Sequence, residues 1–285
     1  MQKIWVCGAR GQIGQAVNDV VDKLEFEMLD TDVDDLDVTD TDEVLRFGEM
    51  NRPDIIINCS GMTDISSCEE NPSQAFKVNA LGARNLAIVA AKMQAKMVQL
   101  STDDVFDGKS TEPYTEFDIT NPGTVYGKSK LAGENYVKEF TTKHFIVRST
   151  WVYGKGQNFI NGFLKKVDAG EQLSIASDQF GSPTSANELA RFLLHLVHTS
   201  EYGTYHATNK GVCSRYAFAH EILKMTGKTA SMQPVPTVMS DFSKVRPAYA
   251  VLDNFIMSMV PIYDFPDWQD SLREYLEERG LYHAE

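Results

Sequence analysis

The sequence has few cysteines, and none of them are paired at a spacing typical of a disulfide or zinc motif. The four cysteines are Cys7, Cys59, Cys68 and Cys213, and the first two lie in the apolar runs IWVCG and IIINCSG. Thiols in such runs are typical of buried side chains in a reducing compartment, so we expect a cytoplasmic protein. The six histidines form no cluster at ligand spacing. We therefore predict no metal site, although carboxylates that bind Mg²⁺ stay an open alternative.

The chain also lacks long apolar runs, low-complexity tracts and a repeat of fixed period. Its N-terminus, MQKIWVCGARG, enters an apolar strand without a basic leader or a cleavage site, so we expect no secretory signal and no membrane span. Basic residues are too few to balance the acidic ones: 27 Lys and Arg stand against 40 Asp and Glu, a net charge of −13. This surplus disfavours nucleic acid and anionic membranes as partners, and an anionic ligand must be bound by local groups.

The first half of the chain alternates short apolar runs with amphipathic segments, which is the pattern of βαβ units in a parallel sheet. With 285 residues, 42% of them hydrophobic, the chain can bury a large core. We predict a Rossmann-type doubly wound α/β fold, with an NAD(P)-binding domain over residues 1–150 and mainly a smaller α/β substrate-binding lobe over residues 151–285. The boundary is soft, because late segments of such chains often return to the main sheet. Strands are expected at 4–7, 26–29, 55–59, 97–100 and 145–147, and helices at 12–24, after 39–40, and at 72–93, 125–140, 186–197, 215–225 and 268–278.

A glycine-rich turn follows the first predicted strand and precedes a predicted helix. Gly8, Gly11 and Gly14 give the spacing that allows a tight turn, a close approach of the backbone to a pyrophosphate, and close packing of helix on strand. The helix N-terminus adds N–H donors and a partial positive charge. A plain structural turn has the same spacing, but the flanking strand and helix favour dinucleotide binding. The residues expected to bind the cofactor here are Gly8, Arg10, Gly11, Gln12, Ile13 and Gly14.

Two residues point to different nicotinamide cofactors. Asp30 ends the second apolar run about 20 residues after the glycines, where a carboxylate can bind the ribose hydroxyls of NADH. Arg10 lies in the glycine turn, where a guanidinium can reach the 2′-phosphate of NADPH or simply be a solvated loop residue. Asp37 and Val38, in LDVTD, are expected beneath the adenine, with an acidic helix cap as the alternative. We therefore predict NADPH or NADH.

Tyr126 and Lys130 are the candidate catalytic pair. They stand four residues apart in YGKSKLAGE, at the start of a predicted helix, so both project from one face. Surface neighbours share this spacing by chance, but reduction of a ketone needs a proton donor. A tyrosine, with an ordinary pKa of about 10, serves when a nearby cation stabilises its phenolate. Lys128 falls on another face of the helix. Thr102 ends the fourth predicted strand at the carboxyl edge of the sheet, where its hydroxyl can bind the carbonyl or cap a turn.

Taken together, these segments resemble the dTDP-4-dehydrorhamnose reductases, a branch of the extended short-chain dehydrogenases. The resemblance covers nearly the full length. SDQFGSPT and STWVYG are its most specific segments, because they separate this family from related epimerases and dehydratases. The segments that carry it are GARGQIGQ, LDVTD, RPDIIINCSG, VNALGARNLA, LSTDDVFDG, NPGTVYGKSKLAGE, RSTWVYG, GQNF, SDQFGSPT and KVRPAYAVLD.

The resemblance implies an activity and a set of roles. The reaction would be reduction of the C4 keto group of dTDP-4-dehydro-L-rhamnose to dTDP-L-rhamnose, a late step in the synthesis of polysaccharide precursors. By the same likeness Tyr126 donates the proton, Lys130 binds the ribose and lowers the pKa of the tyrosine, and Thr102 orients the carbonyl. Further cofactor contacts are implied for Gly61, Met62, Thr63 and Leu100.

The resemblance also implies a substrate-binding set. Trp151 is expected to pack on the substrate, with a place in the core as the alternative. Arg246 is expected to face the nucleotide, where a diphosphate needs a fork of donors, or else to pair with one of the many carboxylates. The residues expected to contact the substrate are Thr102, Asp103, Asp104, Trp151, Asn158, Gln179 and Arg246.

Three residues depart from the family pattern. Asp104 stands where a tyrosine is usual, Ser66 where an aspartate is usual, and Ala250 where a serine is usual. All three lie on stretches expected near the substrate. They leave the reductase chemistry intact, but they leave the identity of the sugar open.

Other functions remain possible on the same scaffold. A nucleotide-sugar dehydratase is one alternative, because that reaction needs carboxylate acid-base groups and Asp103 is followed directly by Asp104. Another reductase or an epimerase is a further alternative. A non-catalytic, NADP-binding regulatory subunit, as in the similar methionine adenosyltransferase β subunit, is the alternative from another class, and the intact tyrosine and lysine argue against it. The helices that start at Pro72 and Val125 could form a homodimer or pack on the chain's own sheet.

Overall fold

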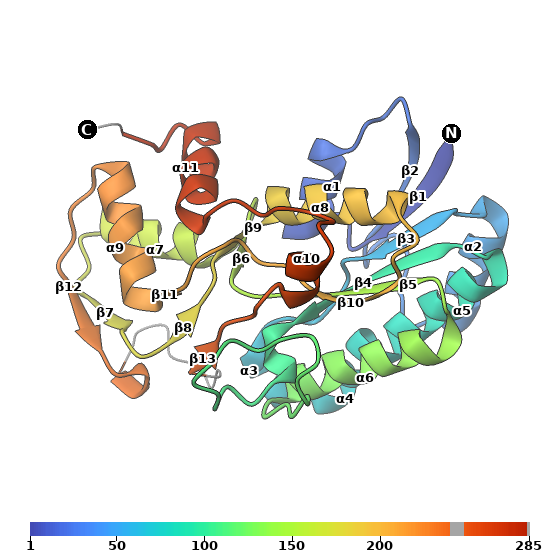
Figure 1. Cartoon of the computed structure of the whole chain (residues 1–285), viewed down its shortest axis with the longest axis horizontal. Coiled ribbons are helices and arrows are strands. Elements are labelled where there is room, and N and C mark those ends of the chain that lie inside the picture. The colour runs from blue at the N-terminus through green and yellow to red at the C-terminus, as the bar shows by residue number, and fades with distance from the viewer. Residues whose placement is uncertain (240–247, 284–285) are drawn as a thin grey trace.

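The computed structural model describes residues 1–239 and 248–283. A parallel sheet forms the centre of the larger lobe (Figure 1). Its six strands, in order across the sheet, are β2 (Phe26–Thr31), β1 (Gln2–Cys7), β3 (Ile55–Asn58), β4 (Lys96–Thr102), β5 (His144–Ser149) and β10 (Gly203–His206). The chain moves to one side of β1 to form β2 and to the other side to form β3. Such a switch point leaves a crevice at the carboxyl ends of the strands, where α/β proteins bind ligands.

Helices cover both faces of this sheet. The helices α1 (Gln12–Val20) and α8 (Ala186–His198) pack on one face, and α2 (Thr41–Asn51), α5 (Ala83–Met93) and α6 (Val125–Phe140) pack on the other. The side chains of β1 alternate between the two cores, with Ile4 and Val6 facing α1 and α8, and Trp5 and Cys7 facing α2 and α5. All four are completely buried. This explains why the strand is a continuous apolar run, as expected for a sheet covered on both faces.

The five predicted strands of the first half are confirmed, and two predicted helices differ from the prediction. The segment 72–93 is divided into α4 (Pro72–Phe76), a π-helical turn η1 (Lys77–Gly82) and α5. The first helix ends at Val20 because Asp22 starts a turn, in which its carbonyl accepts hydrogen bonds from Glu25 and Phe26. A short helix, α3 (Ile65–Glu70), was not predicted.

A second, smaller core lies beside the sheet, to the left in Figure 1. It contains the helices α7 (Phe159–Asp168), α9 (Arg215–Thr226) and α11 (Trp268–Glu278), and the last two match the predicted ranges closely. The chain also returns to the larger lobe, because β10 pairs with β5 and α8 packs on α1. The exact division at residue 150 stays a prediction. The short elements are β6 (Val152–Tyr153), β7 (Leu173–Ala176), β8 (Phe180–Gly181), β9 (Thr184–Ser185), β11 (Cys213–Ser214), β12 (Met232–Val235), β13 (Tyr249–Ala250), η2 (Asp103–Val105), η3 (Thr237–Met239) and α10 (Phe255–Met259).

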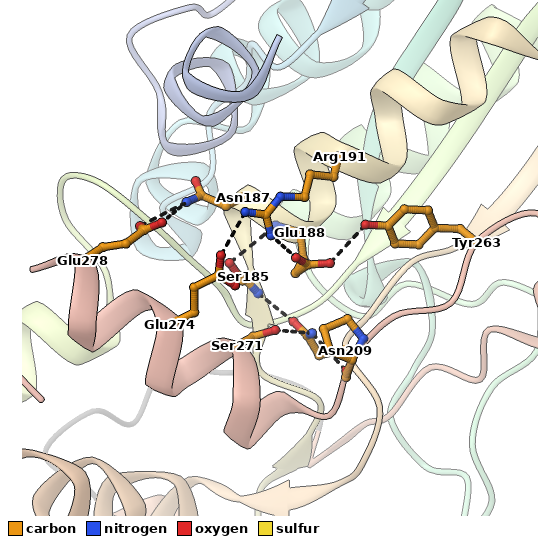
Figure 2. Close-up of polar contacts among 10 residues, drawn as sticks. Ser185, Asn187, Glu188, Arg191, Asn209, Tyr263, Ser271, Glu274 and Glu278 are labelled. Carbon is orange, nitrogen blue, oxygen red and sulfur yellow. Dashed lines mark hydrogen bonds and ion pairs between the residues drawn. The ribbon is translucent and has the colours of Figure 1, made fainter. Parts of the chain in front are cut away.

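Polar contacts join the two lobes near the start of α8 (Figure 2). Arg191 on α8 pairs with Glu188 on the same helix, and its Nη2 lies 2.9 Å from the Oε1 atom of Glu274 on α11. Asn209, which follows β10, donates a hydrogen bond of 2.7 Å to the hydroxyl of Ser271 on α11. Since α8 packs on the main sheet and α11 belongs to the second core, these contacts fix the position of one lobe against the other.

The described residues also lack two features. No helix within 1–239 or 248–283 is long and apolar enough to cross a membrane. Over the same residues, no group of three or more His, Cys, Asp or Glu side chains is placed to bind a metal ion.

Candidate active site

A cleft of about 620 Å³ lies at the carboxyl ends of β1, β3, β4 and β5 and extends to the second lobe. This is the place at which an open α/β sheet is expected to bind its ligands. The structure brings most of the predicted site residues together there. Those that line the cleft are Gly11, Gln12, Ile13, Gly61, Thr63, Leu100, Thr102, Asp103, Tyr126, Lys130, Trp151, Asn158 and Gln179.

The glycine turn is shaped by two close approaches of the backbone. Gly8 has φ +76°, and a Cβ atom there would lie 2.7 Å from the backbone nitrogen of Ser60. A Cβ atom on Gly14 would lie 2.3 Å from the carbonyl oxygen of Gly8. Only glycine fits both positions. The next helix, α1, begins after Gly11 without a side-chain cap, so its first N–H groups face the cleft as donors for an anion.

Arg10 is held by aspartates that follow β2. Its guanidinium Nη2 lies 3.0 Å from Asp34 Oδ2 and 3.4 Å from Asp35 Oδ2, and its backbone N–H donates to Asp32 Oδ2 at 2.8 Å. Asp30 is exposed, one residue before the end of β2, and adds a further carboxylate to this edge. Arg10 therefore lies in a locally acidic setting, which weakens its attraction for a second phosphate.

The predicted adenine contacts lie beside the turn but outside the cleft lining. Asp37 is exposed, and its carboxylate accepts a hydrogen bond of 2.9 Å from the N–H of Thr39 in a local turn, whereas the N-cap of α2 is Asp40. Val38 is buried against Gly82, where a Cβ atom would lie 2.8 Å from Val38 Cγ2. The predicted residues outside the lining are Gly8, Arg10, Gly14, Asp30, Asp37, Val38, Met62 and Asp104.

Tyr126 lies in the first turn of α6. Thr124 caps this helix by accepting a hydrogen bond of 2.9 Å from Gly127 N. Gly127 allows the helix to approach η2, which follows β4, closely, since a Cβ atom there would lie 2.0 Å from the carbonyl oxygen of Asp104. Tyr126 is 8% exposed and lines the cleft. The turn thus positions Tyr126 at the same edge of the sheet as Thr102.

Lys130 lies one helical turn after Tyr126 and lines the same cleft with 5% exposure. Burial lowers the pKa of its ammonium to about 8, and the nearby carboxylate of Glu134 partly opposes this shift. Glu134 is completely buried and accepts hydrogen bonds from Arg148 at 2.9 and 2.7 Å and from the hydroxyl of Ser101 at 2.6 Å. This fixed anion therefore favours a charged lysine at neutral pH.

Asn79 anchors the loop that follows β3. From the π-helical turn η1, its Oδ1 accepts a hydrogen bond of 2.8 Å from Met62 N, and its Nδ2 donates to Met62 O and to the hydroxyl of Ser129, both at 2.9 Å. The loop segment Gly61–Thr63 is thereby tied to α6. The extra residue of a π turn redirects a side chain, and such turns often occur at functional sites.

Thr102 ends β4 and caps η2. Its hydroxyl donates a hydrogen bond of 2.9 Å to Asp103 Oδ1 and accepts one of 3.2 Å from Asp104 N, so the capping alternative is what the structure shows. Asp103 lines the cleft, whereas Asp104 is buried and lies outside the lining. The other two departures also lie outside it, with Ser66 half-buried on α3 and Ala250 buried on β13.

The far end of the cleft is aromatic and cationic. Trp151 has φ +48°, a left-handed conformation that is costly for a bulky residue and is concentrated at functional sites. The guanidinium of Arg215 lies 3.4 Å from the centroid of its ring and 4.8 Å from that of Phe159. Gly181 also packs against the indole, because a Cβ atom there would lie 2.5 Å from Trp151 Cε2.

The other predicted nucleotide contacts are divided. Gln179 is buried and lines the cleft, and its carbonyl accepts a hydrogen bond of 3.0 Å from Arg215 N. Asn158 lines the cleft and caps α7, and its amide donates to Gly154 O at 2.6 Å. Arg246 falls outside the residues that the structure describes.

Several buried polar atoms around the cleft have no hydrogen-bond partner within the described part of the chain. They are Gln12 Oε1, Ser149 Oγ, Thr150 Oγ1 and Tyr153 OH. Buried polar groups are nearly always satisfied in folded proteins, so these four atoms fit a cleft whose partner is a polar ligand. Together with the glycine turn and the open end of α1, they fit a dinucleotide and a sugar.

Sequence reasoning missed part of the lining. These residues are Cys59, Ser60, Asp64, Ser101, Ser149, Thr150, Val152, Tyr153, Phe159, Arg215 and Phe218. Many of them flank a predicted residue directly in the sequence, and extension of each motif by one or two positions would have found them. Arg215 and Phe218, by contrast, do not lie next to any predicted site residue in the sequence. They reach the cleft only through the pairing of β11 with β8.

Comparison with known proteins agrees with this geometry. Residues 1–280 match the family described as the RmlD substrate binding domain. The spore coat polysaccharide biosynthesis protein SpsK of Bacillus subtilis is 35% identical over 281 residues, which cover 98% of this chain and 99% of SpsK. A dTDP-4-dehydrorhamnose reductase from Clostridium acetobutylicum has a TM-score of 0.95 at 40% identity, covering 98% of this chain and 100% of that one.

A second solved structure matches over the same share of the chain. The dTDP-4-dehydrorhamnose reductase from Bacillus anthracis, in complex with NADP, has a TM-score of 0.94 at 35% identity, covering 98% of this chain and 100% of that one. The resemblance inferred from the motifs is confirmed, and so is the predicted Rossmann-type α/β fold. The chain therefore belongs to the dTDP-4-dehydrorhamnose reductase family of the extended short-chain dehydrogenases.

Proposed function

We propose that the protein reduces the C4 keto group of dTDP-4-dehydro-L-rhamnose to give dTDP-L-rhamnose, with NADPH or NADH as reductant. The observation that carries this proposal is one cleft that contains Tyr126, Lys130 and Thr102 beside the glycine turn. The similar solved structures bear the name of this reductase, and one of them contains NADP.

In the proposed mechanism, the chain's own residues orient the ketone and supply a proton. The reduced nicotinamide, when bound, supplies a hydride to C4. Tyr126 donates its phenolic proton to the C4 oxygen, and the Lys130 ammonium stabilises the resulting phenolate. The hydroxyl of Thr102, freed from Asp103, orients the carbonyl. Proton transfer from a positioned group of this kind typically accelerates a reaction about 10²- to 10⁴-fold.

The cofactor contacts divide into three groups. The pyrophosphate would be held by the N–H groups of the first turn of α1, at Gln12, Ile13 and Gly14. Gly8, Arg10 and Gly11 would shape the turn around it, because their own N–H groups donate to Thr31, Asp32 and Gly8. The adenosine end would lie at Asp30, Asp37 and Val38, outside the described cleft, and the nicotinamide end would lie at Gly61, Met62, Thr63, Leu100 and Lys130. These roles are proposals that rest on the positions given above.

The substrate would occupy the rest of the cleft. The sugar would lie against Thr102 and Asp103, and the nucleotide part would lie toward Trp151, Asn158 and Gln179. Arg246 and Asp104 stay predicted contacts, the first because it lies outside the described residues and the second because it lies behind the lining. The smaller lobe, residues 151–285 with the exception of its returning segments, would thus recognise the substrate.

The test of this function follows NADH and NADPH absorbance while dTDP-, UDP- and GDP-linked 4-keto sugars are offered in turn. We expect oxidation of cofactor with dTDP-4-dehydro-L-rhamnose and formation of one equivalent of dTDP-L-rhamnose. Release of water from a dTDP-hexose would instead show that the protein is a dehydratase, the alternative for which Asp103 and Asp104 are the evidence. Cofactor binding without oxidation by any of these sugars would show the regulatory subunit.

We further propose a cytoplasmic homodimer. All four cysteines are free thiols, as expected in a reducing compartment. Phe76 on α4 and Phe140 on α6 are each 38% exposed, which offers apolar surface to a second copy. Light scattering of the purified protein should give twice the mass of the chain. A Phe76→Ser/Phe140→Ser variant should give the mass of one chain. A monomeric wild-type protein contradicts the dimer.

A further inference from the structure

The cleft contains few positive charges for a ligand that carries several negative ones. Within the described residues, the cationic side chains that line it are Lys130 and Arg215. Lys130 lies next to Tyr126 at the reaction end, whereas Arg215 lies beside Trp151 and Phe159 at the other end. Because the chain as a whole has a net charge of −13, a dianionic diphosphate needs a local cation such as this one.

Arg215 is held in a defined position. It is the first residue of α9, its backbone N–H donates to the backbone carbonyl of Gln179 at 3.0 Å, and the residue is 9% exposed. The guanidinium lies 3.4 Å from the Trp151 ring centroid. A guanidinium donates hydrogen bonds in its own plane, so a stacked arrangement leaves the donors at its edge directed sideways. The stack therefore fixes the plane in which the guanidinium donors lie.

The position of Arg215 on its helix also favours an anion. A cation at a helix N-terminus is repelled by the partial positive charge there, and the first turn of α9 carries no acidic side chain. An anion bound at this point would interact favourably with both the guanidinium and the helix terminus. The residue is thus complementary to a phosphate, and its placement is unfavourable for helix stability alone.

We propose that Arg215 binds the diphosphate of the nucleotide-linked sugar and thereby selects nucleoside-diphosphate sugars over free sugars. This inference rests on the proposed function, because it places the sugar of the same substrate at Tyr126. Arg215 provides bidentate, charge-assisted hydrogen bonds to the phosphate oxygens. Trp151 holds the guanidinium flat, and Gly181 leaves the room that the indole needs.

The test compares ligands that differ only in phosphate. Binding of dTDP and of thymidine is measured by calorimetry in the presence of NAD⁺, for the wild-type protein and for Arg215→Met, Arg215→Lys and Lys224→Met. Lys224 lies on the same helix, its side chain is 58% exposed, and it pairs with Glu221. Lys224→Met is therefore the matched control, because it also removes one positive charge but away from the cleft. Melting temperatures check that each variant is folded.

We expect Arg215→Met to weaken dTDP binding roughly 10- to 100-fold, as for loss of hydrogen bonds to a charged group, and to leave thymidine binding within about twofold. Arg215→Lys keeps the charge but loses the fork, so its loss should be intermediate. Lys224→Met should bind both ligands as the wild type does. If Arg215→Met is unstable, the contrast between dTDP and thymidine in Arg215→Lys still decides.

Two results would overturn the inference. Equal losses for dTDP and thymidine would show that Arg215 only supports the shape of the cleft, and undiminished dTDP binding would show that it does not contact the diphosphate. Failure of the proposed function is a separate result. In that case the wild-type protein oxidises no cofactor with any 4-keto sugar, whatever the contrast between the two ligands.

Discussion

The two ends of the cleft are built in different ways. The reaction end lies where the strands of the sheet end, and there Lys130, Glu134 and Arg148 are buried in a network of hydrogen bonds and charges. The recognition end is a stack of side chains from separate short elements, with Trp151 in a left-handed conformation and Arg215 above its ring. The difference indicates that the two ends have separate functions, catalysis at the first and substrate binding at the second. Changes at the first end should alter the rate or the stability, and changes at the second should alter binding.

The largest effect is expected for Tyr126→Phe, at the reaction end. Loss of the proton donor should lower kcat by about 10²- to 10⁴-fold, while KM and the Kd of the cofactor stay within about twofold. Steady-state kinetics and cofactor titration measure both. Tyr136→Phe, on the same helix but packed against Phe140, is the control and should behave as the wild type. Wild-type kcat in Tyr126→Phe removes the tyrosine from the mechanism.

Glu134→Gln should have the next largest effect, which is a loss of the free energy of unfolding. Removal of this carboxylate leaves Arg148 buried without its partner, which typically costs about 3–5 kcal/mol of unfolding free energy. Urea denaturation measures it, and Glu139→Gln, exposed on the same helix, should change stability by less than about 0.5 kcal/mol. Similar small losses for the two variants would mean that the network does not hold the reaction end together.

Gly181→Ala tests the recognition end. The new methyl group would lie 2.5 Å from Trp151 Cε2, so the indole must shift and the stack with Arg215 must change. Overpacking of this kind costs about 1–3 kcal/mol, and we expect KM for the sugar nucleotide to rise about tenfold with kcat near the wild-type value. Gly162→Ala on α7, where a Cβ atom meets nothing within 4 Å, is the control. A fall in kcat at constant KM would contradict the claim that this end of the cleft serves binding alone.

The pH dependence should reflect Lys130. Burial lowers the pKa of its ammonium to about 8, so the lysine is charged below that pH and neutral above it. The charged form stabilises the Tyr126 phenolate, and kcat/KM should therefore fall as the pH rises through 8, by about tenfold per pH unit. A pH profile from 6 to 10 measures this. A flat profile up to pH 10 would show that the charge of Lys130 is not needed.

The smallest effect is expected at the adenosine edge. Because Asp34 and Asp35 surround the guanidinium of Arg10, a 2′-phosphate would meet negative charge there, and NADH should bind more tightly than NADPH. Asp34→Ser/Asp35→Ser should tighten NADPH binding by about threefold at low salt and leave NADH binding unchanged, since exposed charges are strongly screened. Fluorescence titration of both cofactors checks it. Equal tightening of both would contradict the charge argument.

Much of the reaction end could be predicted from sequence, because its information is local. Gly8, Gly11 and Gly14 lie in one turn, and Tyr126 and Lys130 lie on one helical turn, so spacing alone places them. The alternation of strands and helices likewise predicted the central sheet. The role of Asn79 could not be predicted in this way, because a regular period does not reveal the π-helical turn that directs its amide to Met62.

The recognition end was harder to predict, because its residues meet only through tertiary pairing. Arg215 reaches Gln179 through the antiparallel pairing of β11 and β8, two strands of two residues each. Strands this short leave almost no periodic signal in a sequence. Family resemblance identified Trp151 and Gln179 but gave no reason to consider Arg215, and the acidic charge of the chain was the one clue that such a cation was needed.

The most direct measurement compares Tyr126→Phe and Arg215→Met with the wild-type protein in one kinetic experiment. NADH absorbance is followed over a range of dTDP-4-dehydro-L-rhamnose concentrations. We predict that Tyr126→Phe lowers kcat at an unchanged KM, and that Arg215→Met raises KM at a nearly unchanged kcat. If both variants change the same parameter by a similar factor, the two ends do not have separate functions.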